Sequence, residues 1–517
     1  MKYNAILYNI CILLAVVLAS CDKKLDRNPI NTTTAEDVFS TAEGTKQALA
    51  KVYGAFALTS STATDASDIA GIDAGTSDFL RLFWMTQEAP TDEALCIWTS
   101  DPGVMDMDNI TWTSSNVLLN GLYNRSIYQI TVANSFLRET SSSTAVAEDT
   151  LAVYRAEARF LRAYQYWVLL DLFGNPPFLD ENSTIGKEAP KQISRADLFD
   201  YVESELLAIQ DQLLDAQTNE YGRADKAAAW ALLARLYLNA AVYTGTEHYG
   251  DAITYATKVI NSGYSLHTTY SHLFMADNNE NNPETILSIN YDGNYTQNYG
   301  GTTFIVNGAV NSSMSPSSFG IPGGGWGGLV ARKPLPLLFG DDYTTSDDDR
   351  AMFYGTDYEI TDESSFSNGI KVIKFTNKNS DGTTPTDAST FVSTDFPIFR
   401  LAEQYLIYAE ATLRGGSGGS TSQALTYVNL LRSRANTTSL STVSLNDILD
   451  ERGRELYWEC FRRSDLVRYG LFTTSGYLWP WKGGASTGTA VQSYFNLFPI
   501  PASDISANTN LTQNSGY

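Results

Sequence analysis

A pattern of small and aromatic residues at helical spacing occurs twice in the sequence, and it constrains the fold more than any other feature. Residues 224–243 place alanines and leucines three and four positions apart, and residues 251–260 repeat this after a Thr-Gly turn. The second copy runs over 400–414, a Gly/Ser linker and 423–435. Small residues allow two helices to approach closely, and aromatic side chains fill the groove between them. The pattern predicts helical hairpins of the tetratricopeptide type, without the strict register of that repeat.

The rest of the sequence separates a helical scaffold from a region of different texture. Between about 263 and 397, short β-favouring runs such as 303–306 and 370–375 alternate with Gly, Asn, Asp and Pro. We therefore predict a mainly α-helical protein whose scaffold covers about 35–262 and 398–469 and carries a loop-rich, partly β insertion. Loops held by a rigid frame are where binding residues concentrate, so the insertion is expected to carry the ligand face. Apolar stripes predict scaffold helices at 37–58, 117–139, 151–173, 196–214 and 445–469.

The N-terminus has the pattern of a lipoprotein signal peptide. Lys2 precedes an apolar run that is too short to span a membrane, and Leu-Ala-Ser-Cys follows at 18–21. Cys21 is the only nucleophile placed to accept a diacylglycerol, and two acyl signals give stable membrane anchoring. We expect removal of residues 1–20 and a mature chain, 21–517, that forms one domain attached to a membrane through Cys21.

The charge balance and the scarcity of histidine argue against several kinds of function. A formal net charge of −23 makes nucleic acid a poor partner, because phosphate contacts need clustered positive charge. The three histidines lack helical i,i+4 spacing, which disfavours a histidine zinc site or a Ser/His/Asp hydrolase. Cys96 and Cys460 are far apart in the sequence, which leaves open whether they pair. A neutral ligand fits this composition best.

Several blocks along the chain form a recognisable series. Residues 155–164 read RAEARFLRAY and are followed by LFG at 172–174. GRADKAA at 222–228, RLAE at 400–403 and SDLVR at 464–468 come next in order, before an FPIP tail. These blocks resemble those of the SusD/RagB family of lipoproteins, and the resemblance covers nearly the whole mature chain.

The resemblance implies tetratricopeptide-like helices on one side of the fold and a glycan-binding loop face on the other. It also implies a cell-surface location at the outer membrane, where such proteins act as a lid on a TonB-dependent, SusC-like transporter. Proteins of this kind bind rather than catalyse, so no catalytic residue and no required cofactor are expected. A glycoside hydrolase is one alternative, because an acidic chain always offers some suitable pair of carboxylates. A purely structural assembly lipoprotein is another, and it would need no exposed aromatic residues.

The resemblance is strongest to the starch-binding archetype of the family, through segments such as NYGG at 298–301 and WKGGA at 481–485. The archetype has an asparagine where this chain has Asp101. An aspartate accepts hydrogen bonds without donating them, so it cannot make a contact that uses an amide donor. The positions implied for the site are Trp98, Tyr299 and Trp326 in an aromatic arc, with Arg81, Asp73 and Asp101 as polar partners.

Sugar binding favours flat aromatic faces, because a ring attracts the C–H bonds of a pyranose face and removes apolar surface from water. Trp98 lies in a polar, helix-poor segment, and Trp326 lies within the glycine run at 323–328. Tryptophans in such loops have few neighbours to bury them, although packing of the loop onto the core is the alternative. Arg81 can hydrogen-bond two adjacent sugar hydroxyls, or it can take part in an ordinary ion pair. We predict that the three rings form one curved platform for starch or another α-1,4-glucan, whose chain coils.

An oxygen-rich turn at 277–282, with the sequence DNNENN, matches the start of a calcium-binding loop. Asp277, Asn279 and Asn281 would supply its first ligands. The turn has an asparagine where the loop's glycine belongs, and Ser288 stands in place of the closing glutamate. A structural calcium site and a solvated turn are both open interpretations.

Overall fold

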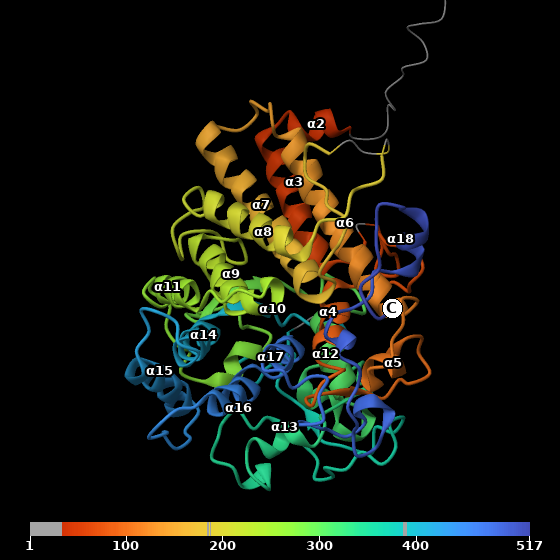
Figure 1. The fold of residues 1–517 in the computed structure, drawn as a ribbon, viewed down its shortest axis with the longest axis vertical. Coiled ribbons are helices and arrows are strands. Elements are labelled where there is room, and N and C mark those ends of the chain that lie inside the picture. The colour runs from red at the N-terminus through yellow and green to blue at the C-terminus, as the bar shows by residue number, and fades with distance from the viewer. Residues whose placement is uncertain (1–33, 61, 184–185, 187, 386–389) are drawn as a thin grey trace, which may run out of the picture.

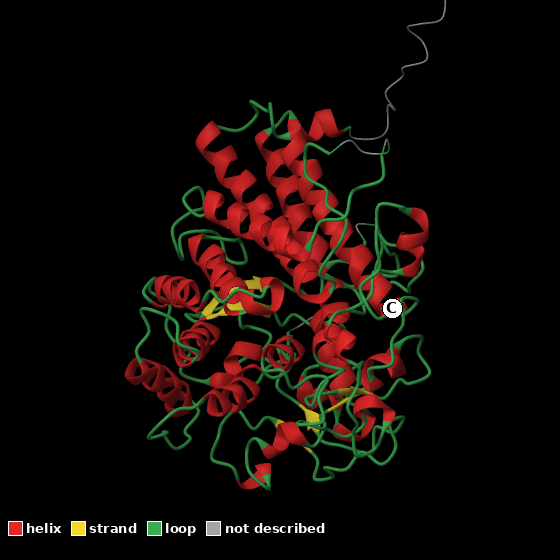
Figure 2. Cartoon of the chain, viewed as in Figure 1, coloured by secondary structure: helices red, strands yellow, loops and turns green. Residues whose placement is uncertain are grey.

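The computed structural model describes residues 34–517 apart from 61, 184–185, 187 and 386–389. The predicted signal peptide, 1–20, and Cys21 lie outside the described residues. Helices dominate the described chain, and strands occur only as short pairs (Figure 2). Helices fill the upper and left parts of Figure 1, whereas loops with short helices and strands gather at the lower right. The predicted mainly α-helical class, with a loop-rich and partly β portion, is confirmed.

The scaffold starts with long helices packed side by side and continues as stacked hairpins. α6 packs against α7, and α7 packs against α8. α9 and α11 form the first predicted hairpin, α14 and α15 form the second, and α11 contacts both α9 and α14. The two hairpins are therefore neighbours in space. The scaffold helices are α2 (Ala35–Phe39), α3 (Ala42–Ala57), α6 (Val117–Glu139), α7 (Glu148–Leu172), α8 (Arg195–Ile209), α9 (Lys226–Leu238), α10 (Ala240–Thr244), α11 (Tyr249–Ile260), α14 (Leu401–Leu413), α15 (Thr421–Arg434), α16 (Leu445–Leu456) and α17 (Arg462–Arg468).

Small residues bring the two hairpins close together. The alanines of α9 are all fully buried. A Cβ atom on Gly416 would lie 2.7 Å from the Ile253 side chain of α11, and one on Gly419 would lie 2.9 Å from it. A close-packed interior has no room for either atom. The Gly/Ser linker between α14 and α15 is therefore a packing element that rests on α11.

Buried ion pairs connect helices that are distant in the sequence. Arg235 in α9 donates from Nε and Nη2 to the two carboxylate oxygens of Glu403 in α14, at 2.6 and 2.8 Å. Arg400 donates to Glu455 at 2.6 Å, to Glu459 at 2.7 and 2.8 Å, and to Glu284 at 2.9 Å. Loss of one partner from such a buried pair leaves an uncompensated charge, which is strongly destabilising.

Three antiparallel pairs of short strands occur among the described residues. β2 (Thr285–Ile289), which lies early in the insertion, pairs with β6 (Phe396–Arg400), which lies at its end. β1 (Leu95–Cys96) pairs with β3 (Leu329–Val330), which joins the N-terminal half of the chain to the insertion. β4 (Phe353–Tyr354) pairs with β5 (Lys371–Val372), which is the only part of the predicted run 370–375 that is a strand among the described residues. The remaining α-helices of the described chain are α4 (Phe79–Gln87), α5 (Val104–Asn109), α12 (Gly301–Ala309), α13 (Pro334–Leu337) and α18 (Ala502–Ala507).

The prediction of a β-favouring run at 303–306 was wrong, because these residues lie within α12. Every residue of α12 is buried, so tertiary packing overrides the low helix propensity of its β-branched side chains. A side chain from another part of the sequence also fixes the start of α12. The Asp78 carboxylate accepts a hydrogen bond from the amide of Gly301 at 2.8 Å.

The predicted helix at 445–469 is divided into α16 and α17. Trp458 and Cys460, which lie between them, have positive φ angles of 63° and 68°. The buried Glu88 carboxylate accepts hydrogen bonds from the amides of Cys460 and Phe461, at 2.6 and 3.3 Å. Glu88, the residue that follows α4, therefore stabilises the break between α16 and α17.

The structure also bears on membrane-spanning helices and on the two cysteines outside the predicted signal peptide and lipidation site. Within the described ranges, no helix combines the length and the apolar character needed to cross a membrane. Cys96 and Cys460 are both buried free thiols, so they do not pair with each other.

Candidate functional site

The pairing of β1 with β3 brings the two predicted tryptophans into contact. Trp98 follows β1, and Trp326 precedes β3. The amide of Ile97 donates to the carbonyl of Gly328 at 2.8 Å, which extends the pairing by one step. The ring centroids of Trp98 and Trp326 lie 6.5 Å apart, with their planes inclined by 44°. Two loops from distant parts of the sequence thus form one aromatic surface.

The glycine run around Trp326 is fastened to the end of α12. The amide of Trp326 donates to the carbonyl of Asn307 at 2.8 Å, and the amide of Gly328 donates to the carbonyl of Gly308 at 2.7 Å. A Cβ atom on Gly328 would lie 2.2 Å from two carbon atoms of the Trp98 ring. Only glycine therefore allows this ring to pack against the backbone here. These hydrogen bonds hold the loop in place, and a loop that is already ordered loses less entropy on binding.

Tyr299 extends the aromatic surface on the other side of Trp326. Its ring centroid lies 6.2 Å from that of Trp326, the planes are inclined by 47°, and Tyr299 is 40% exposed. Gly75 allows the Tyr299 backbone to approach, because a Cβ atom on Gly75 would lie 2.6 Å from the Tyr299 Cβ. The structure brings Trp98, Trp326 and Tyr299 into one row, in which each ring is turned by a similar angle from its neighbour. Their role in binding stays a prediction.

A cavity of about 450 Å³ adjoins the Trp98 end of this row. The guanidinium carbon of Arg81 lies 5.7 Å from the centroid of the Trp98 ring and 4.7 Å from that of Phe304, a distance range typical of cation–π contacts. Arg81 also donates from Nη1 to the carbonyl of Tyr299 at 3.3 Å. All six predicted site residues therefore meet at one place. The predicted polar residues that line the cavity are Asp73, Arg81 and Asp101.

The cavity combines one cation with carboxylates. Oδ1 of Asp78 accepts from the amide of Arg81 at 2.9 Å and from that of Gly301 at 2.8 Å, so one carboxylate fixes the first turns of α4 and α12. Burial lowers the pKa of Arg81 from its ordinary value, and the nearby carboxylates, Asp73 first among them, oppose this change. Because a guanidinium starts from a very high pKa, Arg81 stays charged at neutral pH and offers several donors. Asp101 is exposed and offers acceptors alone.

Asn307 is a positioning residue that the sequence analysis missed. Its buried side chain accepts from the amide of Gly325 at 3.0 Å and donates to the carbonyls of Thr390 at 3.0 Å and Thr303 at 2.9 Å. Asn307 therefore connects the Trp326 loop with the segment around Thr390. Once 303–306 is interpreted as a strand, nothing in the sequence indicates this role, because the role depends on the end of a helix. Phe304, which packs beneath Arg81, was missed for the same reason.

Hydrogen bonds within the protein engage part of the turn interpreted as a calcium loop. Both carboxylate oxygens of Asp277 accept from the amide of Ser380, at 2.9 and 3.0 Å, and one also accepts from its hydroxyl at 2.6 Å. Asn279 and Asn281 are exposed. Across the part of the chain that the structure describes, no group of three or more His, Cys, Asp or Glu residues is arranged to hold a metal ion. Calcium binding at this turn stays a prediction.

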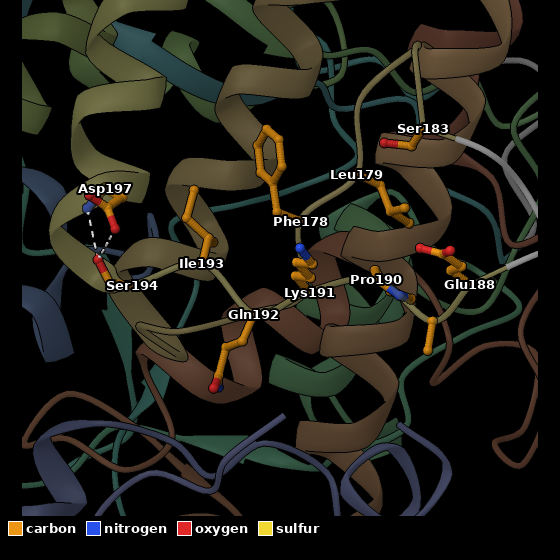
Figure 3. Close-up of a pocket in the computed structure, with 11 residues that line it drawn as sticks. Phe178, Leu179, Ser183, Glu188, Pro190, Lys191, Gln192, Ile193, Ser194 and Asp197 are labelled. Atoms are coloured by element: carbon orange, nitrogen blue, oxygen red, sulfur yellow. Dashed lines mark hydrogen bonds between the residues drawn. The ribbon is translucent and has the colours of Figure 1, made fainter. Parts of the chain in front are cut away.

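A second cavity, of about 540 Å³, lies between the segment after α7 and the start of α8 (Figure 3). Phe178 lines it, but its ring is stacked on Tyr166 at 5.4 Å and meets the edge of Tyr201 at 4.7 Å. Ser194 and Asp197 are engaged in capping α8, where the serine hydroxyl donates to the carboxylate at 2.6 Å. This cavity shares no lining residue with the aromatic row, and its aromatic ring is already packed against protein.

Sequence comparison shows the family. A profile described as "SusD family" matches residues 246–517, and one described as "Starch-binding associating with outer membrane" matches residues 84–238. The Starch-binding protein SusD of Bacteroides thetaiotaomicron is 40% identical over 549 aligned positions, which cover 97% of this chain and 96% of that protein. The chain belongs to the SusD family. A SusD-like protein of Bacteroides ovatus is 28% identical to this SusD-family chain, over 68% of it and 65% of the relative.

Solved structures share the fold of this SusD-family protein. A SusD-like protein from Bacteroides fragilis superposes with a TM-score of 0.72 at 20% identity, over 95% of this chain and 100% of that one. Surface glycan-binding protein A from Bacteroides thetaiotaomicron, in complex with laminarihexaose, superposes with a TM-score of 0.67 at 21% identity, over 92% and 99%. These likenesses concern the fold. SusD-family proteins are non-catalytic binding proteins, so this protein is not an enzyme and the glycoside hydrolase alternative falls.

Proposed function

We propose that this SusD-family protein binds starch or another α-1,4-glucan at the cell surface and delivers it to a TonB-dependent outer-membrane transporter. The observation that carries the ligand class is the row of Trp98, Trp326 and Tyr299, whose successive planes are turned by 44° and 47°. An α-1,4-glucan coils, so its consecutive glucose faces also turn steadily. A row of turned rings can follow such a chain, whereas a flat row would suit a straight chain. The relative named Starch-binding protein SusD supports the same ligand class.

Stacking and hydrogen bonding have different tasks in this proposal. The three rings supply most of the affinity, because each covers apolar C–H surface of one sugar. The cavity beside Trp98 sets the orientation of the bound glucan, because Arg81 donates to sugar hydroxyls while Asp73 and Asp101 accept from them. Exposed hydrogen bonds exchange with water at a small net gain. Arg81→Ala should therefore weaken binding less than loss of a ring.

Native gels that contain dissolved polysaccharide test the ligand class. Trp98→Ala and Trp326→Ala should each lose retardation by amylopectin, because removal of one large aromatic contact costs about 2 kcal/mol and weakens binding more than tenfold. Trp230→Ala is the matched control, since Trp230 is a partly exposed tryptophan of α9 that hydrogen-bonds Gln210 away from the row. It should run like the wild type. Circular dichroism checks the fold of each variant.

The same gel series with levan, xylan and laminarin separates the ligand class from the binding function. Retardation by one of these and not by amylopectin would mean that a different glycan is bound. Retardation by none of the four polysaccharides, amylopectin included, would contradict glycan binding itself.

Attachment and transport form the second half of the proposal. The description of the matched profile, which includes association with the outer membrane, supports the location. Cys21→Ala should leave the protein unacylated and absent from the membrane fraction. Labelled lipid that persists on this variant would contradict lipidation at Cys21. The wild-type protein should co-purify with a TonB-dependent β-barrel after gentle detergent extraction, and recovery only as a free monomer would count against the transporter partnership.

A structural calcium ion at Asp277, Asn279 and Asn281 is an accessory part of the proposal. Calcium should raise the melting temperature of the wild-type protein, and Asp277→Ala should abolish the rise. An identical rise in the variant, or no rise in either protein, would contradict a calcium site at this turn.

A further inference from the structure

The aromatic row continues beyond the three predicted rings. The ring centroid of Phe391 lies 5.3 Å from that of Tyr299, and their planes are inclined by 54°. Along the four rings from Trp98 to Phe391, the successive centroid distances are 6.5, 6.2 and 5.3 Å, and the successive inclinations are 44°, 47° and 54°. The fourth ring therefore lies at a spacing and an inclination similar to those between the first three rings.

Core packing does not account for the position of Phe391. Its side chain is partly exposed. Trp98 and Trp326 are among the partly buried side chains that pack against the hydrophobic core of the described residues, whereas Phe391 is not. A phenyl ring that stays partly exposed and does not contact the core gains less stability from its place than a fully buried ring. Its aromatic neighbour among the described residues is Tyr299, which belongs to the candidate site.

The backbone on both sides of Phe391 is nevertheless firmly held, and by the same helix that holds Trp326. Asn307 of α12 donates from Nδ2 to the carbonyl of Thr390 at 3.0 Å, and the amide of Val392 donates to the hydroxyl of Thr303 at 3.0 Å. The Oδ1 atom of the same Asn307 accepts from the loop that carries Trp326. The buried Asn307 side chain thus fixes the positions of the segments that carry Trp326 and Phe391 relative to each other, as expected for a preorganised binding surface.

We propose that Phe391 is the fourth ring of the glycan platform and gives it a preference for longer α-glucan chains. The charged cavity lies at the Trp98 end, so a short chain anchored there occupies the three nearest rings. Only a longer chain reaches Phe391 and gains its stacking contact. The inference rests on the proposed α-glucan function and adds the chain length that the site selects.

The test compares maltotriose with maltoheptaose by isothermal titration calorimetry. Phe391→Leu keeps an apolar side chain but removes the flat face, whereas Phe391→Tyr keeps the face. The leucine variant should bind maltotriose like the wild type and maltoheptaose about tenfold more weakly, because leucine loses the flat stacking face but keeps apolar surface. The tyrosine variant should bind both sugars like the wild type. Phe178→Leu, at the second cavity, is the control and should change neither affinity.

Each possible result supports or overturns the role proposed for Phe391. Unchanged binding of maltoheptaose by Phe391→Leu would overturn the fourth ring and leave the α-glucan function intact. An equal loss for both sugars would also overturn it, because chain length would then have no role. Failure of the wild-type protein to bind maltoheptaose would overturn the proposed α-glucan function together with this inference. If the leucine variant does not fold, Phe391→Gln replaces it, since its polar side chain tolerates exposure.

Discussion

Gly328→Ala tests the geometry of the site without removing any aromatic ring. The added Cβ would lie 2.2 Å from Cε2 and Cζ2 of Trp98, whereas carbon atoms in contact are about 3.5–4.0 Å apart. The ring must therefore move by more than about 1 Å, out of line with Trp326. Because Gly328 is not among the residues with positive φ, the backbone itself accepts alanine. The whole effect should come from displacement of the ring.

We expect Gly328→Ala to weaken glucan binding by about 2 kcal/mol, or roughly thirtyfold, as though the Trp98 contact were lost. Overpacking should also lower the free energy of unfolding by about 1–3 kcal/mol. Tryptophan fluorescence titration with maltoheptaose gives the affinity, and urea denaturation gives the stability. Gly476→Ala is the control, since its Cβ would have no neighbour nearer than Thr474 Oγ1 at 3.8 Å. Wild-type affinity in Gly328→Ala would refute the idea that the orientation of Trp98 determines binding.

Two predictions concern the buried charges. Arg400→Met should lower the free energy of unfolding by about 3–5 kcal/mol, because three buried carboxylates lose a shared cation, and a urea midpoint like that of the wild type would contradict this. Burial alone would raise the pKa of Glu410, but Arg468 and Arg414 lower it below its ordinary value. Glu410 therefore contributes stability above about pH 4.5 that is lost as the pH falls through the lowered pKa. Melting temperatures measured from pH 7 downward should show this decline, and Arg468→Met should make it shallower.

The sequence was informative where local pattern and structure coincide. The stripes of α9, α11, α14 and α15 predicted the hairpins, because a helix that packs on another must place small and apolar residues at a period of 3.6. The break between α16 and α17 could not be predicted, because the Glu88 carboxylate that holds it comes from a distant helix. The β-branched run at 303–306 indicated the wrong element, because complete burial, not propensity, decides the conformation of α12.

The candidate site was predicted through resemblance rather than through pattern. Nothing in the local sequence indicates that Trp98 lies beside Trp326, since their contact depends on the pairing of β1 with β3. The resemblance supplied three rings and three polar residues, and the structure brings them together. It did not supply Phe391 or Asn307. Phe391 belongs to the row only through its neighbour Tyr299, and Asn307 matters only because α12 ends beneath the glycine run.

The pairing of β1 with β3 also determines at what stage of folding the site can form. Arg81 and Tyr299, which meet at the site beside this pair, are 218 positions apart in the sequence. Closing a loop of that length is slow and entropically costly, so the site should be among the late features to assemble as the chain folds. A ligand that spans both segments would in turn fasten them together. At a hundred times its dissociation constant, a ligand that binds only the native state adds about 2.7 kcal/mol of stability. An occupied receptor should therefore open less often and resist proteases longer than an empty one.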